Sequence, residues 1–107
     1  MIVENLSQAT MFVDLAPEPK MCEELEAVNG TLRDMGGCDV VVDFSNADIV
    51  TASSLSMLLK LRQMLTNSGR RLILCNLACN TRGVFMRTAL DRIFEFAADK
   101  SAVLSGA

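Results

Sequence analysis

The chain has 107 residues, half of them hydrophobic and 21% charged, which is enough apolar material for a packed core and too much for a disordered chain. This length fits one domain, and we expect residues 1–107 to form it. No apolar run reaches the roughly 18 to 20 residues of a membrane helix, and the first residues lack the features of a secretory signal. We therefore expect a cytoplasmic protein with no direct membrane insertion.

The formal net charge is -3, which argues against direct nucleic-acid binding, because nucleic-acid binders concentrate Lys and Arg on one face. The charge is unevenly distributed. Residues 1–59 hold two basic and ten acidic residues, whereas residues 60–107 hold eight basic and three acidic ones. Mutual neutralisation of the two halves within a folded domain is the simpler reading, and a protein-binding patch fits this pattern better than a substrate cleft does.

The residue inventory excludes most enzymatic chemistry. The chain has no His, so Ser-His and Cys-His catalysis and imidazole metal sites are excluded within it. It also lacks the Cys-x2-Cys spacing of zinc or redox motifs and the glycine-rich loops that hold nucleotides. We expect no enzyme activity, no metal and no cofactor, and we expect buried, reduced thiols at Cys22 and Cys75. Cys79 precedes a predicted helix, where a thiolate is favoured, although an inert thiol is the simpler reading.

The first part of the chain predicts two strands and a helix. Ile2 to Asn5 alternates weakly and predicts a short edge strand, and Gln8 to Leu15 is rich in strand-forming residues. A helix over residues 19–35 begins at a proline and ends at Gly36-Gly37. Its apolar residues recur every three or four positions: Met21, Leu25, Val28, Leu32 and Met35.

The rest of the chain continues the alternation. Asp39 to Phe44 is the strongest predicted strand, and its continuous apolar character indicates burial on both faces. A helix closed by Gly69 follows, with an apolar stripe at Leu55, Leu58, Leu59 and Leu65 that Met57, Leu61 and Met64 widen. Arg71 to Leu77 predicts a further buried strand. Asn80 or Thr81 is expected to cap a short helix, Ile93 to Phe96 to form a last strand, and a helical tail to begin at Asp99.

These elements predict an α/β fold, with a mixed sheet of four or five strands flanked by helices. The most distinctive segment is Asn46 to Leu55, which joins the strongest strand to the broadest helix. From this strand onward the chain resembles the STAS domain of bacterial anti-sigma-factor antagonists. The resemblance rests on the strand Val40 to Phe44, the pair Ile49-Val50, Ser53 at the phosphorylatable position, Leu55, the strand Arg71 to Cys75 and the pair Val84-Phe85. Two positions depart from the family pattern, because Thr51 replaces its usual Asp and Ser54 its usual Gly.

The residues themselves allow two roles for Ser53. A Ser at a helix start can cap the helix, which is worth about 1 kcal/mol. However, Thr51, Ser53 and Ser54 supply three hydroxyls, and one cap requires only one. Ser53 can alternatively accept a phosphoryl group, because the exposed N–H groups and dipole of a helix N-terminus tolerate negative charge.

The resemblance implies a regulatory function. It predicts that the chain binds an anti-sigma-factor serine kinase, releases a sigma factor, and is switched by phosphorylation of Ser53, with a phosphatase restoring the serine. We expect the partner to contact the loop formed by Asp48, Ile49, Val50, Thr51, Ala52, Ser53, Ser54 and Ser56. Burial of Ile49-Val50 beneath this loop is an equally open reading. The alternative function is that of a constitutive STAS adaptor in a membrane complex, such as a lipid-transport ATP-binding cassette system.

Overall fold

The computed structural model describes residues 2–7, 10–35, 38–47 and 50–99. The strands are β1 (Ile2–Ser7), β2 (Thr10–Asp14), β3 (Asp39–Asp43), β4 (Leu72–Cys75) and β5 (Glu95–Ala97). The helices are α1 (Lys20–Met35), α2 (Ala52–Asn67) and α3 (Cys79–Arg87), and a 3-10 turn, η1 (Leu90–Arg92), precedes β5. The predicted alternation of strands and helices is confirmed.

The strands form one mixed sheet in the order β1-β2-β3-β4-β5, so their order in space follows their order in the chain. β1 pairs with β2 in the antiparallel sense, and β2, β3, β4 and β5 run parallel to one another. β3 is the central strand. Its register places Val41 opposite Phe12 of β2 and opposite Ile73 of β4.

The sheet buries apolar side chains on both faces, because successive residues of a strand point to opposite sides. Val40 and Val42 of β3 join the main core, whereas Val41 points to the other face. The smaller cluster on that second face consists of Phe12, Val41, Ile73 and Cys75. All three valines have no exposed surface. The prediction that this run of β-branched residues is covered on both sides is confirmed.

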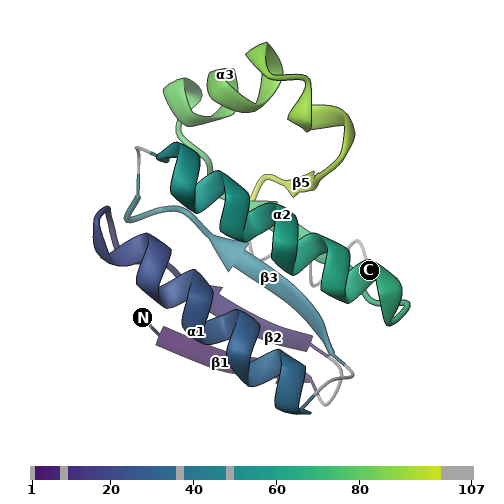
Figure 1. Cartoon of the computed structure of the whole chain (residues 1–107). Coiled ribbons are helices and arrows are strands. Elements are labelled where there is room, and N and C mark those ends of the chain that lie inside the picture. Colours follow the sequence, from purple (N-terminus) through teal and green to yellow (C-terminus); the bar gives the residue numbers. More distant parts are fainter. Residues whose placement is uncertain (1, 8–9, 36–37, 48–49, 100–107) are drawn as a thin grey trace.

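Two of the helices pack on one face of the sheet, side by side (Figure 1). Each presents a line of buried residues at the four-three-four spacing of a helix face. In α1 this line is Met21, Leu25, Val28 and Leu32, as predicted. In α2 it is Ser54, Leu58, Leu61 and Leu65. The expected α2 stripe is therefore shifted, since Leu55 is half-buried and Leu59 is 37% exposed.

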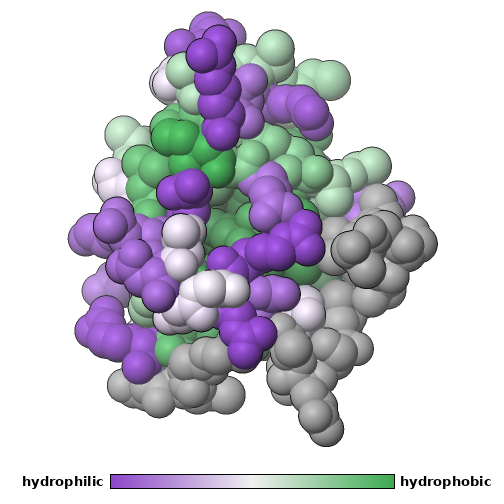
Figure 2. All heavy atoms as spheres, turned by 90° about the vertical axis from the view of Figure 1, so that its right-hand side faces the viewer, coloured by the Kyte–Doolittle hydropathy of each residue, from purple (hydrophilic) through white to green (hydrophobic). Residues whose placement is uncertain are grey.

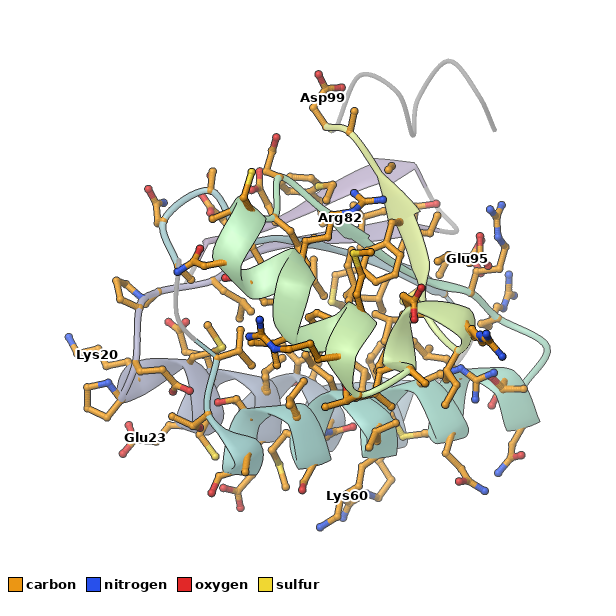
Figure 3. The ribbon with its side chains drawn as sticks, turned by 90° about the horizontal axis from the view of Figure 1, so that it is seen from above. Lys20, Glu23, Lys60, Arg82, Glu95 and Asp99 are labelled. Atoms are coloured by element: carbon orange, nitrogen blue, oxygen red, sulfur yellow. The ribbon has the colours of Figure 1, made fainter. Side chains whose placement is uncertain are left out.

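The last helix lies at the top of Figure 1, beside β5. Phe85 of α3 is fully buried and meets the rings of Phe94 and Phe96 edge to face, at centroid distances of 5.5 and 5.6 Å. From the same helix, Arg82 reaches toward β5 (Figure 3), and its guanidinium carbon lies 5.4 Å from the Phe96 ring centroid. Aromatic packing therefore fixes α3 to the edge of the sheet.

Several predicted boundaries need correction. Neither Asn80 nor Thr81 caps α3: the helix begins at Cys79, its N-cap position is Ala78 without a side-chain bond, and Thr81 is buried. Cys75 is buried as expected, but Cys22 is only half-buried. The predicted Gly36-Gly37 helix end and the tail beyond Asp99 lie outside the described residues.

The surface carries few large apolar side chains among the described residues. Leu59, Met86 and Ile93 are the exposed ones, at 37%, 60% and 40%. Figure 2 shows a hydrophobic area bordered by hydrophilic side chains in the upper half of the molecule, the level that α3, η1 and β5 occupy in Figure 1. No helix in the described part of the chain is long and apolar enough to cross a membrane.

Candidate functional site

The candidate site lies where the parallel strands end and the helices begin. In a parallel sheet, the carboxyl ends of neighbouring strands meet at one edge, and the following loops gather there. The loops after β2 and β3 therefore lie at the same end of the molecule, on the left of Figure 1, where α1 and α2 start. Asp14 and Asp43, the last residues of β2 and β3, are register partners. The predicted partner-binding loop thus has the β2–α1 loop as its neighbour.

Thr51 is the N-cap of α2. Its backbone is extended, and its Oγ1 accepts a 3.2 Å hydrogen bond from the Ser54 backbone N–H. This satisfies one of the N–H groups that the first helical turn leaves without an intrahelical partner. The cap is thus supplied by the threonine that replaces the family's usual Asp, and Ser53 is not needed for it.

A carboxylate from the β2–α1 loop completes the cap. Glu18 Oε2 accepts a 2.9 Å bond from the Thr51 backbone N–H and a 2.7 Å bond from the Ser54 hydroxyl. Burial alone would raise the pKa of Glu18, but the hydrogen bonds from Thr51 and Ser54 outweigh it and lower that pKa. Glu18 therefore places a negative charge at the N-terminus of α2, where the helix dipole favours it. Sequence reasoning missed this residue, because its two bonds join positions 33 and 36 residues apart.

Ser53 and Ser54 have opposite environments. Ser53 is exposed on the first turn of α2, whereas Ser54 has no exposed surface and its hydroxyl is bound to Glu18. The expectation that Ser54 contacts a partner is therefore corrected: its side chain faces the core. One signal in the sequence could have shown this, since Ser54 lies four residues before Leu58 and falls on the buried line of α2.

The other predicted contact residues divide into three groups. Thr51, Ala52 and Ser56 are exposed, like Ser53. Val50 is half-buried and packs against the main core, which favours the reading that this residue supports the loop from beneath. Asp48 and Ile49 lie outside the described residues.

Acidic groups surround the start of the loop. Asp43 is buried, and its Oδ1 accepts a 2.8 Å bond from the Ser45 backbone N–H, which turns the chain away from β3. Asp14 Oδ1 accepts a 3.4 Å bond from the Asn46 amide.

Burial, together with the charges of Asp43, Asp99 and Asp14, raises the pKa of Cys75 to about 12. The Cys75 thiol is therefore protonated at neutral pH.

Comparison with known proteins identifies the family of this fold. A family model described as the STAS domain matches residues 20–102. The chain belongs to the STAS-domain family. The comparison with curated proteins gives no significant match.

Solved STAS structures share the fold. An anti-sigma-factor antagonist (STAS) domain protein from Planctomyces limnophilus has a TM-score of 0.78 and 17% identity, over 98% of this chain and 95% of that one. A candidate anti-sigma-factor antagonist from Thermotoga maritima has a TM-score of 0.77 and 15% identity, over 95% and 90%. The phosphorylated form of the Bacillus cell-fate determinant SpoIIAA has a TM-score of 0.70 and 20% identity, over 99% and 98%. At these identities the likeness establishes the fold.

Proposed function

We propose that this STAS domain acts as an anti-sigma-factor antagonist: it binds an anti-sigma-factor serine kinase, so that a sigma factor is released, and phosphorylation of Ser53 ends this binding. The observation that carries the proposal is the separation of roles at the start of α2. Thr51 caps the helix, and Ser54 is buried and bound to Glu18. Ser53 is exposed and does not cap the helix.

The position of Ser53 suits a modification that changes binding without unfolding the domain. A phosphoryl group would add about -1.5 to -2 charge at the N-terminus of α2, where exposed N–H groups favour anions. A partner docked on the loop would instead have to desolvate this charge. A hundredfold loss of affinity corresponds to only about 2.8 kcal/mol, so one modified residue is sufficient.

The chemistry of the switch belongs to the partners. The kinase transfers the γ-phosphoryl group of its ATP to Ser53 Oγ, ADP leaves, and the kinase accepts the hydroxyl proton. A phosphatase restores the serine by hydrolysis and releases inorganic phosphate. We therefore expect the isolated chain to have no catalytic turnover and to need no cofactor of its own. One similar solved structure, SpoIIAA, is of a phosphorylated form.

A second candidate function is that of a constitutive adaptor in a membrane complex, such as a lipid-transport ATP-binding cassette system. Two positions favour it: Thr51 and Ser54 replace the Asp and Gly of the family's usual phosphorylation motif. In this case partner binding would not depend on the hydroxyl of Ser53, and no kinase would modify it.

One experiment separates the two functions. Affinity purification from native cells identifies the partner, and the purified chain is then incubated with that partner and ATP and analysed by mass spectrometry. The antagonist function predicts phosphate on Ser53 and none on the Ser53→Ala variant. A partner with no kinase activity, or phosphate on another residue with Ser53 unmodified, would contradict the switch and favour the adaptor.

A further inference from the structure

Two hydrogen bonds from Glu18 connect the β2–α1 loop directly to the start of α2. Glu18 belongs to the segment between β2 and α1, and its two hydrogen-bond donors lie on either side of Ser53 in the chain. The Thr51 hydroxyl adds a 3.4 Å contact to the Ser54 hydroxyl, so a carboxylate and two hydroxyls form one small network. The segment is also held to α1, because the Ala16 N–H donates a 2.7 Å bond to Glu24 Oε1 and the Lys20 N–H a 3.1 Å bond to the Pro17 carbonyl.

Ser53 and Glu18 therefore share one helix N-terminus. Glu18 already occupies it as an acceptor, and a phosphoryl group on Ser53 would be a second acceptor with more charge and more oxygen atoms. Two anions at the same helix end repel each other, and the phosphoryl group carries the larger charge.

We infer that Glu18 is the positioning residue that couples the β2–α1 loop to Ser53, and that a phosphoryl group on Ser53 releases this loop from α2. This inference rests on the proposed function, and it extends the switch from one loop to two. The surface that the partner contacts would then change in two ways: residues 16–19 would move, and the phosphate would add charge.

A second feature of the network makes the release selective. The Ser54 side chain has no exposed surface while Glu18 is bound to it. Thr51 Oγ1 stands 3.4 Å away and remains as its neighbour. Helix α2 therefore keeps its cap and its packing, and the segment that moves is the one attached through Glu18.

A double-mutant cycle tests this coupling without any kinase. Phosphoserine is incorporated directly at position 53 of the full chain, in the parent and in Glu18→Gln, and unfolding by urea is measured for all four proteins. The glutamine side chain keeps an acceptor oxygen and removes the charge. We expect phosphoserine to be at least threefold less favourable for the folding equilibrium in the parent than in the Glu18→Gln variant. The matched control is Glu26→Gln, which removes an exposed carboxylate on α1 and leaves the β2–α1 loop unchanged.

Amide NMR spectra of the same proteins locate the change. We expect phosphoserine to shift the amide signals of Ala16, Glu18 and Lys20 in the parent, and to leave the signals at these three positions within the error of measurement in Glu18→Gln. Zero coupling, coupling of the opposite sign, or equal coupling with Glu26→Gln would each overturn the inference. Because the phosphoserine is installed directly, that failure would leave kinase recognition of Ser53 untouched. Conversely, a kinase that ignores Ser53 would refute the proposed function without removing the coupling.

Discussion

Ser54 donates a 2.7 Å hydrogen bond to Glu18 across 36 positions of the sequence, and its side chain has no exposed surface. The family's usual Gly at this position has no hydroxyl to donate. The carboxylate that the family usually carries at the position of Thr51 is also absent here. Both positions that depart from the motif, Thr51 and Ser54, bind the carboxylate of Glu18. Glu18 thus supplies a carboxylate at this helix end.

This relationship predicts how the family residue would behave in this chain. In Thr51→Asp the carboxylate can still cap α2, but it lies beside Glu18 and the two charges repel. We expect Thr51→Asp to destabilise the parent and to be neutral or stabilising in a Glu18→Gln background, with a coupling of at least about 0.5 kcal/mol. Urea unfolding measures it. The control Thr51→Ala removes the cap without adding a charge and should cost about 1 kcal/mol in the parent. Equal effects of Thr51→Asp in both backgrounds would contradict the repulsion.

The lowered pKa of Glu18 predicts a pH dependence of stability. Because this pKa is lower in the folded chain, the ionised carboxylate contributes stability above its unfolded pKa of roughly 4.3. That contribution is lost as the pH falls through the folded pKa. We expect Glu18→Gln to lose less stability than the parent between pH 6 and pH 3, measured by urea unfolding at each pH. Parallel curves for the two proteins would show that Glu18 makes no such contribution.

Ser53 substitutions test the proposed switch. We expect Ser53→Asp to weaken partner binding at least tenfold, about 1.4 kcal/mol, while the melting temperature stays nearly unchanged, because Ser53 is exposed and does not cap α2. Ser53→Ala should bind as the parent does. Calorimetric titration with the purified partner measures both. A single carboxylate imitates a phosphate imperfectly, so the phosphorylated protein is the reference for the size of the effect. Undiminished binding of the phosphorylated protein would argue against the switch.

The central strand allows a test of the fold. Val41 has no exposed surface and lies between Phe12 and Ile73. We expect Val41→Asp to cost more than about 4 kcal/mol, because it buries a charge without a partner. Val41→Ala should cost about 2 kcal/mol through the lost apolar burial and the cavity that it leaves. Thermal and urea unfolding measure the difference. A soluble, cooperatively folded Val41→Asp protein of near-parent stability would be incompatible with this burial.

Thiol reactivity distinguishes two of the cysteines. Burial and the neighbouring acids raise the pKa of Cys75 to about 12, so almost no thiolate exists at pH 8, whereas Cys79 is exposed. We expect a thiol reagent to label Cys79 in the native protein and to reach Cys75 only after unfolding. Peptide mapping after brief labelling identifies the site. Native labelling of Cys75 at the rate of Cys79 would place it at the surface.

The sequence predicted the order of elements because their signals are local. The β-branched run Val40–Val42 and the regular spacing in α1 each lie within a few residues, and both elements formed where expected. The expectations that failed depend on distant partners. Leu59 belongs to an apolar pattern but faces solvent, whereas Ser54 is polar and faces the core, because Glu18 of another loop binds its hydroxyl.

Sequence patterns indicated only part of the candidate site. The loop before α2 was proposed as the partner-binding loop from a local motif, whereas nothing local indicated that the β2–α1 loop lies beside it. Only the parallel register of β2 and β3 brings the two loops together, and that register is a property of the sheet. The aromatic contact of Phe85 with Phe94 and Phe96 was not predicted either, because it depends on how α3 packs against the β5 edge of the sheet.

The strand order of the sheet also bears on how the chain is made. Each strand pairs with the strand that precedes it in the chain, from β1 to β5. A nascent polypeptide can therefore add one strand at a time to an existing edge as it leaves the ribosome, without waiting for a distant segment to be inserted. The β2–α1 loop with Glu18 is synthesised before α2, so its carboxylate is available when the first turn of that helix forms.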